Sequence, residues 1–412
     1  MDLQNSIPHT GFVSGAGKKE TLYPAATAEN VGDRFMEASV ELKWQDELNN
    51  NVTTIEELKE YIELDASEEK KLQRIIDAHP MSIPRYYLSL IDPSDPNDPI
   101  RKMAVPSVEE LDLDGSYDTS GERKNTKLSG LQHKYDNTVL LLSSNVCAMY
   151  CRHCFRKRMV GLSNDEIMNR FHEACRYIAN HPDVNNVLIS GGDSLILPTH
   201  VLGNFLDRLT RLEQLDYIRF GTRMAVTFPD RILRDPELLE LFRAYSKKYR
   251  RIYLHTQFNH PREITPQTVE AVNLVIKSGV IVNNQTVLLK GVNDNAHVLA
   301  ELQRNLVRIG VNPYYVFQCR PVKRVKNHFQ VPLAEGYRIV AKARGMLDGL
   351  SKRFRFAMSH ERGKIEILGI LGKEMFFKHQ QAADAQDVGR FFKRRLDEKA
   401  GWLDELQKCQ PA

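Results

Sequence analysis

Hydrophobic and polar positions along most of the chain show two kinds of pattern, one typical of strands and one typical of helices. Short apolar runs rich in β-branched residues recur about every thirty residues: Thr138–Ser143, Asn186–Ser190, Tyr217–Thr222, Arg251–Thr256, Val280–Leu289 and Tyr314–Gln318. The segments between them carry apolar residues at helical spacing: Asp165–Ile178, Leu202–Leu212, Pro236–Tyr249 and Pro266–Lys277. Strands that alternate with helices in this way form parallel βαβ units. The pattern therefore predicts an α/β fold, a partial parallel (β/α)6 TIM-like barrel, with Arg353–Met358 as a further edge strand.

The segments on the N-terminal side of the barrel are less regular. Residues 1–33 lack periodicity, which favours a mobile N-terminal tail. Residues 34–110 are expected to form an N-terminal helical region and a connector. Within them, Thr53-Thr54 begins a helix, because a threonine followed by acidic and then apolar residues is typical of a helix start. The stretch Asp92–Pro99 is expected to be extended, since each proline disfavours helix in the residue before it.

The C-terminal side is predicted to end in a helix. We assign residues 111–372 to the barrel and residues 373–412 to a C-terminal helical extension. Within the extension, Gln386–Leu406 is charged and amphipathic. Such a segment favours a C-terminal helix that packs on the barrel or on a partner subunit.

Composition narrows the class of protein. The 412 residues are 42% hydrophobic and 27% charged, as in an ordinary globular chain with a sizeable core. The net charge of only +4 is spread along the chain, so no nucleic-acid surface is indicated. Apolar stretches such as Val139–Leu142 are far shorter than the roughly 20 residues of a membrane span. The N-terminus lacks a basic segment followed by an apolar one, so we expect a cytoplasmic enzyme without a secretory signal.

The cysteines are unevenly placed. Three lie within eight residues after the first predicted strand: Cys147, Cys151 and Cys154. The other three are isolated: Cys175, Cys319 and Cys409. Clustered cysteines in a reduced compartment favour metal ligation over disulfides. Three thiolates on one loop suit an iron–sulfur cluster that keeps one position open, or zinc, although His153 between two cysteines is poorly placed as the fourth ligand that zinc prefers.

The cysteine spacing, its place after the first strand and the aromatic, basic tail Phe155–Arg158 resemble those of radical S-adenosylmethionine (SAM) enzymes. The end of the second predicted strand, Ile189–Asp193, is similar to the motif with which that superfamily contacts the methionine amino group. The resemblance implies a 4Fe–4S cluster on the three clustered cysteines, with SAM bound at its open iron. It also implies cofactor contacts from three residues of the second strand's end: Gly191, Gly192 and Asp193.

Further strings resemble the lysine 2,3-aminomutase family. They run from about Trp44 to about Leu368: Ser89–Pro93, Pro96–Arg101, Tyr150–Arg158, Val187–Asp193, Phe258–Pro261, Asn284–Gln285, Val287–Leu289, Gly291–Asp294 and Pro313–Tyr315. The resemblance implies that an amino acid is held by pyridoxal 5'-phosphate (PLP), loses a β-hydrogen to a radical and moves its amino group from the α to the β carbon. Lys364 stands where the family places the catalytic lysine that binds PLP.

The phosphate site departs from the family pattern. The glycines that precede the family lysine are replaced by His360-Glu361-Arg362, which argues against binding by backbone amides and makes Arg362 a candidate phosphate contact. Two family arginines that hold the phosphate align with Lys134 and Thr138, so Lys134 retains one positive charge. A family histidine aligns with Gln257. The chain is therefore identified as a divergent member.

The substrate is expected to differ from lysine. Arg156 aligns with the arginine that binds the substrate carboxylate, a task that suits a guanidinium. The two family aspartates that bind the distal ammonium align with Arg320 and Ala357, so both anions are missing and one has become a cation. An ammonium that faces Arg320 would lose its counterions and meet a like charge. Lysine is therefore expected to be a poor substrate, whereas glutamate, with its distal carboxylate at Arg320, fits the charge.

The resemblance also bears on partners and on further contacts. It implies an electron donor of the flavodoxin or ferredoxin type and a homo-oligomer, without nucleic acid or membrane. Asn259, His260 and Gln285 lie at strand ends, where they are candidates to bind adenosine or the pyridine ring. No second, zinc-binding site is expected, because Asn295 replaces its first cysteine. Two alternatives stay open: a PLP-independent radical SAM enzyme on the same scaffold, and a zinc-bound structural or binding protein.

Overall fold

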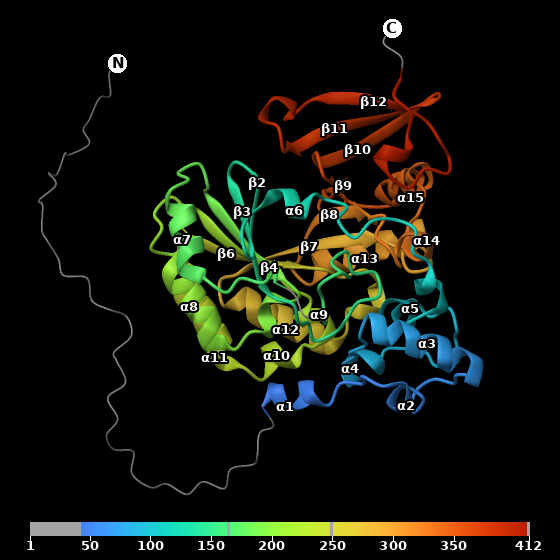
Figure 1. Cartoon of the computed structure of the whole chain (residues 1–412), viewed down its shortest axis with the longest axis horizontal. Helices are drawn as coiled ribbons and strands as arrows, with labels where there is room; N and C mark the ends of the chain where they lie inside the picture. The colour runs from blue at the N-terminus through green and yellow to red at the C-terminus, as the bar shows by residue number, and fades with distance from the viewer. Residues whose placement is uncertain (1–42, 163–164, 248–249, 410–412) are drawn as a thin grey trace, which may run out of the picture. The chain divides into compact units, whose positions relative to one another are not determined.

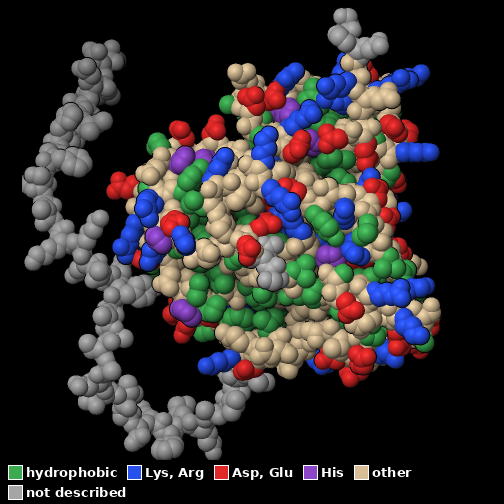
Figure 2. Space-filling view, viewed as in Figure 1, with side chains coloured by type: hydrophobic (Ala, Val, Ile, Leu, Met, Phe, Trp, Pro, Cys, Tyr) green, Lys and Arg blue, Asp and Glu red, His purple; other side chains and the backbone are tan. Residues whose placement is uncertain are grey.

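A computed structural model describes residues 43–162, 165–247 and 250–409 (Figure 1). The expected tail over residues 1–33 and the start of the expected helical region, residues 34–42, lie outside this part of the chain. The described residues belong to one compact unit. Within them, no helix combines the length and the apolar character needed to cross a bilayer. On the face that Figure 2 shows, basic and acidic side chains are interspersed, which agrees with the nearly balanced composition.

One sheet of 12 strands organises the fold, and its strands neighbour one another in sequence order. The central strands are β3 (Thr138–Ser144), β4 (Asn186–Gly191), β5 (Tyr217–Gly221), β6 (Arg251–Thr256), β7 (Ile281–Leu288), β8 (Asn312–Gln318) and β9 (Arg355–His360). Every pairing from β3 to β9 is parallel. The predicted α/β fold with a partial parallel barrel is therefore confirmed, and the strand expected at Arg353–Met358 is β9. At one edge, β1 (Thr126–Leu128) and β2 (Leu131–Tyr135) continue the sheet with antiparallel pairings.

Helices connect the parallel strands and cover the outside of the sheet (Figure 1). They are α7 (Phe171–Ala179), α8 (Thr199–Leu209), α9 (Met224–Thr227), α10 (Asp230–Leu233), α11 (Pro236–Tyr245), α12 (Pro266–Lys277), α13 (Ala296–Arg308), α14 (Lys326–Phe329) and α15 (Leu333–Gly345), with the short 3-10 turns η2 (Ser194–Ile196) and η3 (Pro261–Glu263). The local sequence determines where several of these helices begin. The Asp235 carboxylate, for example, accepts a hydrogen bond from Leu238 N at 3.0 Å, and Pro236 occupies the first helical position of α11.

Side-chain alternation along each strand decides which residues face the barrel interior. In β7, Gln285 and Val287 line a central cavity, whereas Val282 lies in the hydrophobic core. In β5, Arg219 lines the same cavity, whereas Phe220 is buried in the core. The period-two pattern of the strands therefore separates the side chains that line the cavity from those that are packed in the core.

The N-terminal region forms short helices (blue to teal in Figure 1). They are α1 (Trp44–Asn49), α2 (Ile55–Leu58), α3 (Ala66–Ala78), α4 (Arg85–Leu88), α5 (Pro99–Ala104), η1 (Val108–Leu111) and α6 (Glu122–Asn125). The expected helix start is confirmed at α2, where the Thr54 hydroxyl accepts a hydrogen bond from Glu57 N at 3.2 Å. This region supports the cysteine loop, because Asn51 Nδ2 donates to Ala148 O at 2.7 Å.

The expected C-terminal helix over Gln386–Leu406 is wrong. Antiparallel strands β10 (Gly363–Leu371), β11 (Glu374–Ala382) and β12 (Phe391–Arg395) instead extend the sheet beyond β9, with η4 (Ala385–Asp387) and η5 (Leu403–Glu405) as short turns. Gly389 has a φ of 80°, a left-handed conformation that interrupts a helix. Phe392 pairs with Phe377 of β11, and their ring centres are 5.3 Å apart. The expected boundary after residue 372 falls in the turn between β10 and β11.

Candidate active site

A cavity of about 370 Å³ lies where the parallel strands end, the usual place for chemistry in such barrels. Most of the residues that the sequence suggested for the cluster, the cofactors and the substrate line it: Lys134, Cys147, Cys151, Cys154, Arg156, Gly191, Gly192, Asp193, Gln285, Arg320 and Lys364. Another hollow, of about 530 Å³ and bordered by Lys290 and Lys326, contains none of them. The fold thus brings the predicted residues together in one cavity, which we take as the candidate active site.

The glycine pair at the end of β4 packs against the loop that follows β3. Gly192 N donates to Ser144 O at 2.5 Å, and Asp193 N donates to Val146 O at 2.9 Å. A Cβ atom at Gly191 would lie 2.3 Å from Ser144 O, and one at Gly192 would lie 2.3 Å from Val146 O. Only glycine permits so close an approach. The pair therefore positions the segment that leads into the first clustered cysteine.

The Asp193 carboxylate ties the end of β4 to the end of β5. Its Oδ1 accepts hydrogen bonds from Thr222 Oγ1 at 2.6 Å and from Leu195 N at 2.9 Å. Its Oδ2 accepts from Arg223 N at 2.6 Å. Burial raises the pKa of Asp193, while these hydrogen bonds oppose the rise. Asp193 lies on the cavity wall, and its contact with SAM stays a prediction.

The three clustered cysteines fit an iron–sulfur cluster. Burial raises the pKa of the Cys147 and Cys154 thiols, and the neighbouring cysteine sulfurs add to the rise. Buried, neighbouring cysteines become thiolates only when a bound cation balances their charge. In the described segments, no group of three His, Cys, Asp or Glu side chains is arranged to hold a single metal ion. In a 4Fe–4S cluster each cysteine binds a different iron, and all three clustered cysteines line the same cavity.

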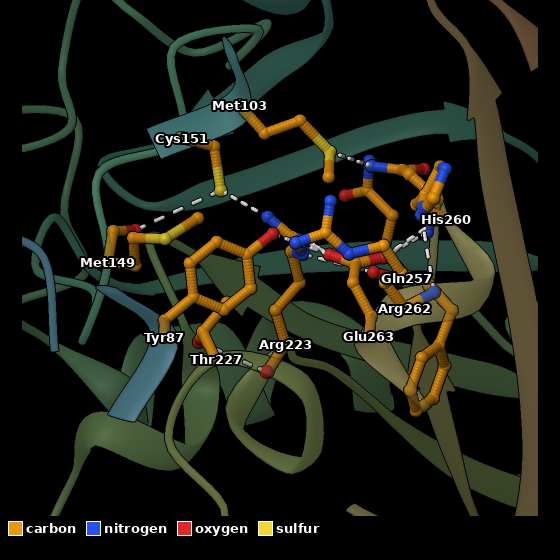
Figure 3. A network of polar contacts seen from close by, with 12 residues as sticks. Tyr87, Met103, Met149, Cys151, Arg223, Thr227, Gln257, His260, Arg262 and Glu263 are labelled. Carbon is orange, nitrogen blue, oxygen red and sulfur yellow. Dashed lines mark hydrogen bonds and ion pairs between the residues drawn. The ribbon is translucent and has the colours of Figure 1, made fainter. Parts of the chain in front are cut away.

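Arg223, just after β5, links one of these thiols to a buried carboxylate (Figure 3). Its Nη1 donates to Cys151 Sγ at 2.7 Å, and its Nη2 donates to Glu263 Oε1 at 2.6 Å. The hydroxyl of Tyr87 donates to the same oxygen at 2.7 Å. Arg223 Nε donates to the carbonyl of Gln257 at 3.0 Å. Each guanidinium nitrogen therefore has a partner, and one of the partners is a predicted cluster ligand.

Arg156, the predicted carboxylate ligand, forms an ion pair. Its Nη2 lies 3.0 Å from Glu122 Oε1, and its Nη1 donates to Ser190 Oγ and to Gly191 O, each at 3.1 Å. Glu122 also pairs with Arg158 Nη2 at 2.6 Å. Although burial acts to raise it, the charges of Arg156 and Arg158 lower the pKa of Glu122 to about 2. The carboxylate therefore stays ionised and fixes Arg156 at the cavity wall.

Lys364 extends from β10 into the cavity among other positive charges. Its Nζ lies 4.6 Å from the centre of the Tyr315 ring. Burial lowers the pKa of Lys364 to about 7, and the charges of Arg219, Lys134 and Arg320 act in the same direction. At neutral pH a sizeable fraction of such an amine is unprotonated, which is the nucleophilic form.

Lys134 and Arg320 line the same cavity without a carboxylate partner in the described residues. Burial lowers the pKa of Lys134 to about 8 and that of Arg320 to about 10. Lys134 Nζ donates to Ser120 O at 3.1 Å, and Arg320 Nη1 donates to Ser120 Oγ at 2.9 Å. The Arg320 guanidinium carbon is 4.1 Å from the centre of the Phe155 ring. Both cations are therefore placed to meet an anionic ligand.

Arg219 is a cavity cation that sequence reasoning missed. Its Nη2 donates to Asn186 Oδ1, whereas its Nε is buried and has no hydrogen-bond partner. No carboxylate of the described chain pairs with it. A signal was present, because a charged residue between Ile218 and Phe220 interrupts an otherwise apolar strand. Its side chain belongs to the inward-facing set of β5.

The loop between β9 and β10 is a poor phosphate cradle. His360 is fully buried, with its Nε2 2.8 Å from Asp404 Oδ2. Glu361 and Arg362 are exposed, and neither lines the cavity. The suggested phosphate contact through Arg362 is therefore not supported by its position, whereas Lys134 lies on the cavity wall.

The three polar residues at strand ends have different surroundings. Gln285 lines the cavity, and its Nε2 lies 2.6 Å from His255 Nδ1. Asn259 and His260 are not among the lining residues. His260 begins η3 and accepts a hydrogen bond from Arg262 N at 3.2 Å. Of the three, Gln285 is the one placed to contact a ligand.

Comparison with known proteins finds relatives over most of the chain. Residues 141–302 match the radical SAM superfamily. A putative L-lysine 2,3-aminomutase of Aquifex aeolicus is 43% identical over 85% of this chain and 93% of its own. The L-lysine 2,3-aminomutase of Clostridium subterminale is 41% identical over 74% of this chain and 73% of its own, and the glutamate 2,3-aminomutase of Clostridioides difficile is 36% identical over 75% and 71%. A solved radical SAM methyltransferase from Sphaerobacter thermophilus has a TM-score of 0.36 at 16% identity, over 55% of this chain and 68% of that chain.

Proposed function

The chain belongs to the lysine 2,3-aminomutase family of radical SAM enzymes, and from this we propose that it moves the amino group of glutamate from the α to the β carbon with the help of PLP. Membership makes the protein an enzyme of the isomerase type and implies a 4Fe–4S cluster and SAM. The proposal concerns the finer points, namely PLP and the identity of the substrate.

The observation that carries the proposal is the position of Lys364 in the same cavity as the clustered cysteines. An amine with a pKa of about 7 is suited to bond with the aldehyde of PLP. No carboxylate in the described part of the chain forms an ion pair with Lys364, and the charges that act on its amine are those of other cations. A role in binding PLP would explain why the Lys364 amine is buried among other cations.

PLP, when bound, supplies the electron delocalisation that such an amino migration requires. Its phosphate needs positive charge, which Lys134 and Arg219 offer at the cavity wall in place of glycine backbone amides. When the substrate takes its place, Lys364 Nζ would leave as a free amine. With a pKa of about 7, that released amine could take up the proton that the substrate ammonium gives up in the exchange.

The substrate proposal rests on two guanidinium groups that share one aromatic neighbour. The guanidinium carbons of Arg156 and Arg320 lie 4.7 Å and 4.1 Å from the centre of the Phe155 ring. Two cations held in this way suit a dicarboxylic amino acid, with Arg156 at the α-carboxylate and Arg320 at the distal one. A distal ammonium would instead meet Arg320 as a like charge.

Among acidic amino acids, glutamate fits the reaction better than aspartate. Moving the amino group of aspartate from its α to its β carbon places it next to the other carboxylate, which regenerates the aspartate skeleton. Glutamate has one more methylene, so the same migration yields a distinct β-amino acid. Glutamate is therefore the smallest common dicarboxylic amino acid whose 2,3-migration gives a different compound. An enzyme of this type that is specific for dicarboxylates is expected to act on it.

PLP uptake tests the proposal directly. We expect the wild-type protein, reconstituted anaerobically, to bind PLP and to show its visible absorbance band. Lys364→Ala should lose the band while it keeps the iron and sulfide of the wild type. Lys290→Ala, at an exposed lysine outside the cavity, serves as the matched control and should keep both. A wild-type protein that takes up no PLP would contradict the proposal.

A second candidate function keeps the radical chemistry without PLP. The exposed Arg362 and the buried His360 favour it, because neither contributes to a phosphate site in the cavity. Under this alternative, the reconstituted wild type would cleave SAM yet bind no PLP, and Lys364→Ala would leave SAM cleavage unchanged.

We also propose partners on the basis of the family resemblance. A flavodoxin or ferredoxin type of protein would supply the electron, and the chain would form a homo-oligomer. Reduction of the cluster by each donor class and light scattering of the purified protein test these two points.

A further inference from the structure

Arg223 is held in one orientation by contacts at both ends of its residue. Its backbone N–H donates to Asp193 Oδ2 at 2.6 Å, and its guanidinium bonds Glu263, Gln257 O and Cys151 Sγ (Figure 3). The Arg223 side chain is only 10% exposed. Apart from its bond to Cys151, the contacts that fix this cation beside the predicted cluster ligand are with Asp193, Gln257 and Glu263.

Glu263 is in turn held in place by other groups. Its Oε2 accepts hydrogen bonds from Asn259 N at 2.5 Å and from His260 N at 3.0 Å, while its Oε1 accepts from Tyr87 OH at 2.7 Å. The Glu263 side chain is fully buried. These hydrogen bonds fix the position of the Glu263 carboxylate independently of Arg223. The carboxylate therefore restrains the guanidinium nitrogen that does not contact the sulfur.

The charge beside a cluster sulfur affects how readily the cluster is reduced. Hydrogen bonds to the sulfurs and nearby charge are among the factors that set iron–sulfur potentials. One electron makes the cluster more negative, so a neighbouring cation stabilises the reduced state and a neighbouring anion destabilises it. In a buried site, screening of these charges by water is weak.

We propose that Arg223 raises the reduction potential of the 4Fe–4S cluster through its hydrogen bond to the Cys151 sulfur, and that the negative charge of Glu263 beside it opposes this effect. One electron enters the cluster from the external donor, and Arg223 neither gains nor loses electrons or protons. The pair of opposite charges thus forms a fixed dipole with its positive end toward the cluster. The proposal rests on the cluster of the family and is independent of PLP and of the substrate.

A purely structural role for Arg223 predicts something different. As a simple cross-link between β5 and η3, it would affect stability and cluster content, and removing either member of the pair would have the same kind of effect. A role in setting the potential predicts opposite signs for the two members, because one is a cation and the other an anion. The sign of the shift therefore separates the two roles.

The experiment is an EPR-monitored redox titration of the reconstituted protein without SAM. We expect Arg223→Gln to lower the midpoint potential by about 59 mV or more, which is a tenfold change in the equilibrium for a one-electron couple. Glu263→Gln should shift the potential to a more positive value. Arg223→Lys keeps the charge and should lie between Arg223→Gln and the wild type.

Arg231→Gln is the matched control. Arg231 is also buried and pairs with Asp235 at 2.5 Å, yet it bonds no cysteine, so its loss should leave the potential near the wild-type value. If Arg223→Gln fails to hold a cluster, Arg223→Lys and Glu263→Gln still decide the sign. Shifts of the same sign at both positions, no shift at either, or a wild type without a reducible cluster would overturn the proposal.

Discussion

Glu122 and Arg156 form a buried ion pair on the cavity wall, with Oε1 and Nη2 3.0 Å apart. Glu122 begins α6, just before the first strand of the sheet, whereas Arg156 follows the cysteine loop. The pair therefore connects α6 to a residue that we expect to bind substrate. Arg158 pairs with the same carboxylate and also with Glu166, whereas Glu122 is the carboxylate that pairs with Arg156 in the described residues.

Removal of this carboxylate should be costly. We expect Glu122→Gln to lower the free energy of unfolding by about 3 kcal/mol, since it leaves the buried guanidinium of Arg156 without its counterion. Denaturant unfolding measures the change. Glu173→Gln is the matched control, because the Arg170–Glu173 pair at 3.2 Å is exposed and should contribute no more than about 1 kcal/mol. Equal losses at the two positions would contradict the assignment.

The same pair predicts a pH dependence of stability. The pKa of Glu122 falls from an ordinary value of 4.5 to about 2 in the folded protein. A carboxyl group whose folded pKa is depressed stabilises the fold above its unfolded pKa and loses that contribution as pH falls toward the folded pKa. The wild type should therefore lose stability between pH 4.5 and about 2 more steeply than Glu122→Gln does. Parallel curves in acid unfolding would contradict this.

PLP uptake should depend on the ionisation of Lys364. Because the pKa of Lys364 is lowered to about 7, uptake should rise as pH passes through that value. Arg219 is one of the charges that lower it, so Arg219→Gln should move the midpoint of the absorbance titration to a higher pH. Arg211→Gln, at an exposed arginine, should leave it unchanged. A midpoint in Arg219→Gln that stays or falls would argue against this electrostatic coupling.

Arg320 should decide which distal group is accepted. We expect Arg320→Asp to lower kcat/KM for glutamate by roughly 30-fold or more, as for loss of a buried charge pair worth about 2 kcal/mol. Turnover of lysine should rise in the same variant, because the added anion suits an ammonium. Arg320→Lys keeps the charge and should retain the preference for glutamate. Unchanged selectivity in Arg320→Asp would remove Arg320 from the distal site.

Much of the barrel could be predicted because its strands carry local signals. The segment Arg251–Thr256 places the apolar run Ile252–Leu254 between polar residues, and it forms β6 over the same bounds. The C-terminal region had no such unambiguous signal. Phe391, Phe392 and Leu396 agree with helical spacing, yet Phe392 packs on Phe377 of β11. That pairing depends on a distant strand, which a local pattern does not reveal.

The residues of the candidate site likewise differ in whether local sequence reveals them. Cys147, Cys151 and Cys154 could be predicted from their close spacing on one loop. Glu122 and Glu263, by contrast, are single acids in segments far from the cysteines in sequence, and only the folded chain places them beside Arg156 and Arg223. Local motifs therefore identify the cluster ligands, whereas charges that hold or tune those ligands depend on tertiary contacts.

Product analysis tests the central claim most directly. The protein is reconstituted anaerobically with iron, sulfide, PLP, SAM and a reductant, and glutamate or lysine is added before the products are identified by NMR. Our account predicts β-glutamate, with much slower formation of β-lysine. Faster conversion of lysine than of glutamate, or cleavage of SAM without a β-amino acid from either, would contradict it.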